Sequence, residues 1–131
     1  RQAKHLVSPN LYVNKQHADY GLLFARSKKI LRGGREIGIV GYTLNSKCFY
    51  GANISKIFHW GCATKAINKT VRELESQGVD IIIALGHAGL NAFDLHLAKK
   101  IPGIDAIVGG HSHNFLWNEP ENPVVSVGCR G

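Results

Sequence analysis

The apolar run from Val79 to Leu85 constrains the fold of this chain more than any other feature. Such a run is typical of a central strand in a parallel sheet, where neighbouring layers bury both of its faces. The residues directly upstream, 61–77, have the period of a helix, and Gly78 is a suitable stop. The apolar face of that predicted helix consists of Ala63, Ile67, Val71 and Leu74.

A second helix and a second buried strand follow the apolar run. Residues 91–94 resemble a capped helix start, with Asp94 near the positive end of the helix dipole, and Pro102 ends this short helix. Residues 104–108 then form another buried strand. Together with a strand at 36–42, these elements predict an α/β fold whose last strand–helix–strand unit is a right-handed parallel crossover.

The N-terminal half has weaker patterns. A Gly-Gly pair at 33–34 predicts a hairpin between the moderately apolar residues 20–31 and the strand at 36–42. The glycines of the latter strand allow a neighbouring backbone to approach closely. Residues 5–13 predict a short strand, whereas residues 44–59 lack periodicity and are expected to form a surface loop.

Histidines follow both predicted parallel strands. His87 comes after the first strand, and His111 and His113 come after the second, behind two glycines. Because the carboxyl ends of parallel strands lie at one sheet edge, we expect the three imidazoles to converge there. An extended backbone would point His111 and His113 to the same side. Imidazole binds zinc, manganese, iron and nickel, so we predict a metal site, with a hydrogen-bonded histidine cluster as the alternative.

The other candidate groups are assigned structural roles. Asp94 has the position of a helix cap and Asp105 begins a strand, so neither is a convincing bridge between two metals. The sequence contains no P-loop, dinucleotide fingerprint or GxSxG elbow. The histidines to which we assign a structural or merely exposed position are His5, His17, His59 and His96.

Composition bounds the class of protein. A chain of 131 residues, 44% of them hydrophobic, suits one domain with a core, and no apolar run is long enough to cross a membrane. The formal charge of +7 favours anionic partners, but the basic residues are dispersed, so we expect a solvated basic surface instead of a nucleic-acid interface. Three cysteines fit no zinc-binding spacing, and they are Cys48, Cys62 and Cys129.

Two stretches resemble the 5'-nucleotidase/apyrase family within the calcineurin-like metallophosphoesterases. They are residues 35–43 (REIGIVGYT) and residues 78–117, which contain the GH and GGHSH motifs. The resemblance covers most of 7–117. It assigns residues 1–117 to a partial metallophosphoesterase domain and leaves 118–131 as an unassigned tail. The absence of methionine, even at the first position, predicts that the chain is part of a longer protein.

The resemblance implies a partial sandwich in which helices flank β-sheets, and two divalent metal ions. Zinc is expected first, with manganese, calcium and magnesium as alternatives. His87 and His111 would bind one metal and His113 the other, as ligands and not as acids or bases. The family's Asp-x-His motif, bridging aspartate and Asn-His pair would lie before Arg1. We therefore expect no catalytic residue in this chain, which would be inactive alone while its parent is an enzyme.

The activity implied for the parent is hydrolysis of AMP to adenosine and phosphate. Apyrase activity on ATP and ADP is one alternative, and a secreted binding protein that lost catalysis is another. Family members are commonly secreted or held at the cell surface by a lipid anchor. We therefore expect an extracellular protein with a nucleotide as its partner and no nucleic acid. Glycosylation sequons at Asn53 and Asn68 agree with that location.

Overall fold

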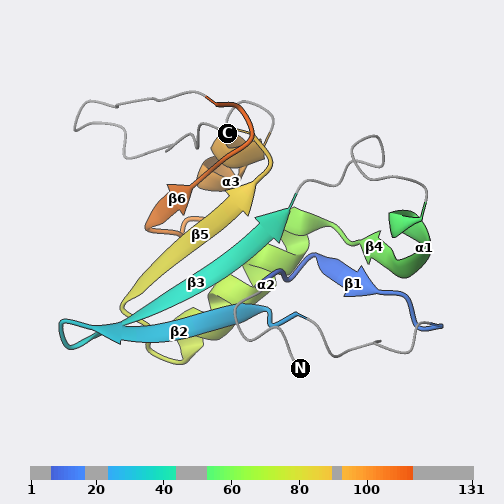
Figure 1. Cartoon of the computed structure of the whole chain (residues 1–131). Coiled ribbons are helices and arrows are strands. Elements are labelled where there is room, and N and C mark those ends of the chain that lie inside the picture. The colour runs from blue at the N-terminus through green and yellow to red at the C-terminus, as the bar shows by residue number, and fades with distance from the viewer. Residues whose placement is uncertain (1–6, 17–23, 44–52, 90–92, 114–131) are drawn as a thin grey trace.

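The computed structural model describes residues 7–16, 24–43, 53–89 and 93–113 (Figure 1). These residues form a four-stranded sheet in the order β2-β3-β5-β6 and a two-stranded sheet of β1 and β4. The strands of the larger sheet are β2 (Ser27–Arg32), β3 (Arg35–Thr43), β5 (Ile81–His87) and β6 (Ala106–Val108). Strands β3, β5 and β6 are parallel, and β2 is antiparallel to β3. The expected α/β fold with parallel strand–helix–strand units is confirmed.

The β2–β3 hairpin turns at the glycine pair that the sequence indicates. Gly33 and Gly34 have φ angles of 57° and 77°, and Arg32 pairs with Arg35 on either side of them. Backbone of this kind suits two-residue hairpin loops and strongly favours glycine. The first arm begins at Ser27, and residues 17–23 lie outside the described residues.

Helix α2 (Ala63–Ser76) packs on one face of the large sheet, as Figure 1 shows, and contributes three buried side chains to the core. The predicted apolar face of this helix is confirmed, because Ile67, Val71 and Leu74 are almost fully buried. Burial of each such side chain contributes about 1.5–3 kcal/mol to folding. Helix α3 (Leu95–Lys100) adds Leu97 to the same core. Within the described ranges, no helix is long and apolar enough to cross a membrane.

The opposite face of the large sheet is open to solvent near its carboxyl edge. Leu85 is 50% exposed and Val108 is 37% exposed. Side chains alternate along a strand, so His87 lies on the same face as Leu85. A parallel strand usually has both faces buried. In this chain, the face that bears His87 is therefore accessible.

The smaller sheet corrects the loop expected at 44–59. Helix α1 (Ile54–Ile57) and strand β4 (Phe58–Trp60) lie within that range, and β4 pairs antiparallel with β1 (Leu11–Val13). The prediction is wrong for residues 54–59, because elements of three or four residues are too short to leave a period in the sequence. Residues 44–52 lie outside the described part of the chain.

Two contacts join the N-terminal segment to the end of β3. The buried Asn10 side chain donates to the Thr43 carbonyl oxygen at 3.1 Å and accepts from the Thr43 amide at 3.3 Å. A Cβ atom at Gly41 would lie 1.7 Å from the Val7 carbonyl oxygen. The close backbone approach expected for the glycines of this strand is confirmed at Gly41.

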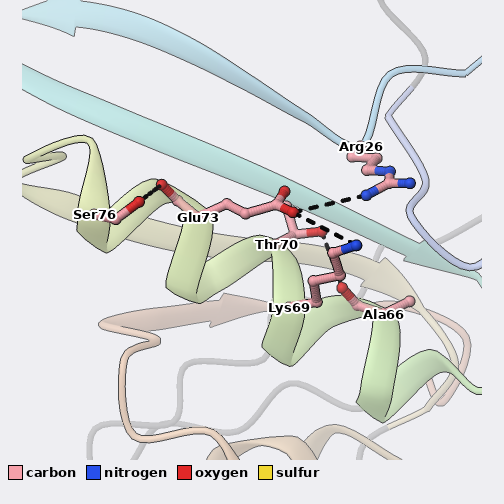
Figure 2. Close-up of polar contacts among 6 residues, drawn as sticks. All are labelled: Arg26, Ala66, Lys69, Thr70, Glu73 and Ser76. Carbon is pink, nitrogen blue, oxygen red and sulfur yellow. Dashed lines mark hydrogen bonds and ion pairs between the residues drawn. The ribbon is translucent and has the colours of Figure 1, made fainter.

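The exposed side of α2 carries dispersed charge (Figure 2). The Oε1 atom of Glu73 lies 3.8 Å from Nη1 of Arg26 and 3.9 Å from Nζ of Lys69. All three side chains are well exposed, so each pair contributes only about 0–1 kcal/mol. These pairs agree with the solvated basic surface expected from composition.

Candidate metal centre

His87 and His111 meet at the carboxyl edge of the large sheet. His87 is the last residue of β5, and His111 lies three positions after the end of β6. Their rings are edge-on, with centroids 5.2 Å apart and an interplanar angle of 74°. The convergence expected from the parallel strands is confirmed for this pair.

The distance between the two rings suits a shared cation. The Nε2 atom of His87 lies 3.4 Å from the Nδ1 atom of His111. This is long for a hydrogen bond, whose usual N···acceptor distance is about 2.9–3.0 Å. Two nitrogens that each bind a tetrahedral zinc at about 2.0–2.1 Å are separated by about 3.4 Å. The distance between the two nitrogens therefore matches that expected for one shared metal ion.

His113 lies outside this pair. Both His111 and His113 have positive φ angles, 85° and 54°, so the segment after β6 is a turn. The extended backbone expected here is wrong, because the strand ends at Val108 and the chain then bends sharply. Over the described ranges, no three or more His, Cys, Asp or Glu side chains form a metal-binding group. Positive φ at residues other than glycine is uncommon and concentrates at functional sites.

Backbone hydrogen bonds join the loops that present the two histidines. The Gly89 amide donates to the Gly110 carbonyl oxygen at 3.1 Å, and the Asp94 amide donates to the Gly89 carbonyl oxygen at 3.2 Å. A Cβ atom at Gly110 would lie 3.0 Å from Nδ1 of His87. Glycine at this position lets the His87 ring lie directly against the backbone of the second loop.

A buried tyrosine–aspartate pair lies next to the first of these loops, because the amide of its aspartate donates to Gly89. The hydroxyl of Tyr42 donates to Oδ1 of Asp94 at 2.6 Å. Asp94 is 1% exposed, and its Oδ2 atom has no hydrogen-bond partner among the described residues. Asp94 is the N-cap residue of α3, as predicted, but its side chain turns inward and makes no cap hydrogen bond. No local sequence signal connects Asp94, at the start of α3, to Tyr42 on β3.

Burial controls the ionisation of both groups. Burial raises the pKa of the Asp94 carboxyl, while the hydrogen bond from Tyr42 and the positive charge of His87 oppose that shift. Burial also raises the pKa of the Tyr42 hydroxyl above its ordinary value of 10.0, and its hydrogen bond to Asp94 and the charge of that carboxylate raise it further. The ionised carboxylate is therefore costly here, and the Tyr42 donor and the charge of His87 offset that cost only in part.

Tyr42 also touches the peptide that precedes His87. Tyr42 and Gly86 are opposite each other in the parallel register of β3 and β5. A Cβ atom at Gly86 would lie 2.1 Å from Cε2 and Cζ of the Tyr42 ring. The tyrosine ring therefore rests on the Gly86 backbone and limits where His87 can be placed.

Other candidate residues have structural contacts. Oδ2 of Asp105 accepts from the Ile82 amide at 2.7 Å, which confirms the structural role expected for this aspartate. His59 stacks on Tyr12, and its Nδ1 atom lies 3.0 Å from Oδ1 of Asn14, as expected for a structural histidine. Cys62 is exposed and free. The residues of this group that lie outside the described part of the chain are His5, His17, Cys48 and Cys129.

An apolar cavity lies away from the histidine pair. It has a volume of about 390 Å³, and Phe24, Phe58 and Trp60 are among its lining residues. Tyr42 and Thr43 line it from the end of β3, but His87, His111 and His113 do not. The cavity is therefore separate from the candidate metal centre.

Comparison with known proteins identifies the family, although no family model matches the chain. A 5'-nucleotidase of Mus musculus is 38% identical over 104 residues, which are 78% of this chain and 18% of that protein. An apyrase of Tabanus yao is 39% identical over 104 residues, 76% of this chain and 18% of that protein. This chain belongs to the 5'-nucleotidase/apyrase family. The resemblance seen in the GH and GGHSH motifs is thereby confirmed.

Structural comparison agrees with this family membership. The crystal structure of a 5'-nucleotidase precursor from Thermus thermophilus matches with a TM-score of 0.70 and 31% sequence identity. The match covers 93% of this chain and 24% of that one. The chain therefore has the metallophosphoesterase-type α/β fold, and it spans 18% of the curated relatives described above. Enzymes of this family depend on metal ions in general, and the nitrogen spacing of His87 and His111 fits that requirement.

Proposed function

We propose that this chain is part of a metal-dependent phosphohydrolase that removes phosphate from extracellular nucleotides, with AMP as the first substrate. The observation that carries the proposal is the 3.4 Å distance between Nε2 of His87 and Nδ1 of His111 at the sheet edge. The 38% identity with a 5'-nucleotidase supports the choice of AMP. Apyrase activity on ATP and ADP is the second candidate, supported by the 39% identity with an apyrase.

The metal ligands in the proposal are His87, His111 and His113. Nε2 of His87 and Nδ1 of His111 would hold one cation, and His113 would contribute to a second site. Imidazole ligands favour zinc, and the family resemblance leaves manganese, calcium and magnesium as alternatives. When bound, the metal ions supply Lewis acidity, which lowers the pKa of a water molecule and neutralises charge on phosphoryl oxygens.

The chain's own residues orient these ligands. If Nε2 of His87 binds the cation, the ring proton lies on Nδ1, which faces the Gly110 backbone. The hydrogen bond from Gly89 to Gly110 keeps that backbone next to β5. Polar groups that fix the second nitrogen of a ligating histidine raise metal affinity and select one tautomer. In the proposal these residues bind and orient, and none of them transfers a proton.

The proposal also includes an extracellular location. Asn53 is exposed at the start of α1, where a glycan would find room. Secretion, or attachment to a membrane through a lipid anchor, would place the metal centre where extracellular nucleotides are present. Detection of the protein in the culture medium or at the surface of expressing cells tests this part.

Phosphate release from AMP, ADP and ATP by the complete encoded protein tests the activity. We expect release from AMP, loss of that release with a chelator, and recovery on addition of zinc. His111→Ala should abolish release and lower the zinc content measured by mass spectrometry, whereas His96→Ala, on the exposed side of α3, should change neither. Unchanged turnover after complete metal removal would overturn the proposal. Residues 1–131 alone are expected to release no phosphate.

A further inference from the structure

The buried carboxylate of Asp94 lacks a full set of partners. Its Oδ1 atom accepts from Tyr42, but among the described residues its Oδ2 atom accepts no hydrogen bond, although Asp94 is only 1% exposed. Removing a carboxylate from water without compensating hydrogen bonds costs free energy. Each unsatisfied buried group of this kind calls for an explanation, which can be an ion or a functional site.

Two structural connections run from Asp94 to the histidine pair. Through its side chain, Asp94 fixes the hydroxyl of Tyr42, whose ring rests on the Gly86 peptide immediately before His87. Through its backbone, the Asp94 amide donates to Gly89, and the Gly89 amide donates to Gly110, immediately before His111. Asp94 is therefore linked to the segment before His87 through Tyr42 and to the segment before His111 through Gly89.

Charge makes a third connection. The carboxylate of Asp94 attracts cations, and its contact with Tyr42 links it to the peptide that precedes His87. A ligating imidazole is neutral, so a divalent cation on Nε2 of His87 would bring two positive charges to this part of the molecule. Inside a protein such charges attract more strongly than in water, because the local dielectric constant is lower.

We propose that Asp94 is a positioning residue for the cation site: held by Tyr42, it orients the His87–His111 pair, and its carboxylate favours a cation between the two rings. This inference rests on the proposed function, since it concerns the metal that the histidines would bind. It assigns Asp94 a role different from that of a helix cap or of an ordinary core residue.

Asp94→Asn separates this role from a purely structural one. Asparagine has nearly the same volume, and its carbonyl oxygen can still accept from Tyr42, but its charge is absent. Because burial makes the ionised acid costly, the variant should unfold at the same temperature as the wild type or at a higher one. A residue with a structural role alone would affect melting and leave metal affinity unchanged.

The first measurement is the zinc affinity of the 131-residue chain, by competition with a chromophoric chelator. We expect Asp94→Asn to weaken zinc binding about 10–100-fold, the usual effect of losing an outer-shell partner of a ligating histidine. Tyr42→Phe, which keeps the ring over Gly86, should weaken it less. Asp105→Asn is the matched control, because its carboxyl binds the backbone of Ile82. Equal affinities for Asp94→Asn and the wild type would overturn the inference.

The second measurement needs no metal. Nitrogen NMR shifts of histidine rings report the tautomer and orientation of His87 and His111 in the metal-free chain. We expect the shifts of His87 to change in Asp94→Asn and to stay the same in Asp105→Asn. Unchanged His87 shifts in Asp94→Asn would overturn the positioning role. Failure of the wild-type chain to bind zinc would instead contradict the ligand assignment in the proposed function, and the ring shifts would still decide whether Asp94 orients the pair.

Discussion

Nε2 of His87 lies 3.4 Å from Nδ1 of His111, although 24 residues separate the two histidines along the chain. The relationship follows from topology. Strands β5 and β6 are parallel neighbours, with Leu85 opposite Val108, so both carboxyl ends lie at one edge of the sheet. The remaining distance between the rings is set by the loop after β6, whose backbone is held to Gly89.

The first prediction is that the two histidines bind zinc as a unit. His87→Ala and His111→Ala should each weaken zinc binding by at least about tenfold, because either change leaves a single nitrogen of the pair. The double variant should bind little more weakly than either single variant, as expected for residues that share one ligand. Isothermal titration calorimetry on all three measures this, with His96→Ala as the control. Additive losses would indicate that the histidines bind zinc independently.

A second prediction concerns the contact between Gly86 and the Tyr42 ring. Gly86→Ala should destabilise the fold by about 1–3 kcal/mol or more, because the added methyl group would overlap the Tyr42 ring in a packed core. Urea denaturation measures the free energy of unfolding. Gly33→Asn is a useful control, since nothing lies within 4 Å of a Cβ atom there and asparagine tolerates positive φ. Similar stability changes in both variants would contradict the contact.

The third prediction is a pH dependence that involves Tyr42. Folding raises the pKa of its hydroxyl above 10.0, so the stability due to the neutral tyrosine is fully present below about pH 10. Above that pH the unfolded chain loses the proton first, and the stability falls. Tyr42→Phe should lower stability at pH 7 by about 1.5–3 kcal/mol, because Asp94 loses a donor, and should show a shallower loss above pH 10. Guanidinium denaturation at pH 7 and pH 11 tests this, and equal alkaline losses would contradict it.

The fourth prediction distinguishes the two glycosylation sequons. Asn53 is exposed, whereas Asn68 is partly buried within α2. The sequon hydroxyl of Thr70 is also occupied, since it donates to the Ala66 carbonyl oxygen at 2.9 Å (Figure 2). In a secretory host we expect a glycan at Asn53, so Asn53→Gln should remove the glycan mass and Asn68→Gln should leave it. A loss of mass with Asn68→Gln alone would show the opposite preference.

Local sequence patterns were sufficient to predict the elements whose apolar residues repeat at regular spacing. The apolar positions of α2 repeat at helical spacing, and Ile67, Val71 and Leu74 are buried as expected. The glycine pair at 33–34 is at the hairpin turn because positive φ is required there. Residues 54–60 were missed, since β4 exists through its pairing with β1, far away in the sequence.

The sequence by itself determined the parallel α/β unit, because apolar periodicity can be recognised within each segment. It also determined that His87 and His111 meet, because each follows the end of a predicted parallel strand. Tertiary structure alone decided the turn that separates His113 from the pair and the inward rotation of Asp94 onto Tyr42. The hydrogen bond between Tyr42 and Asp94 spans 52 residues. Contacts between residues so far apart in the sequence depend on how the layers pack, and this packing produces no periodic pattern in a single amino-acid sequence.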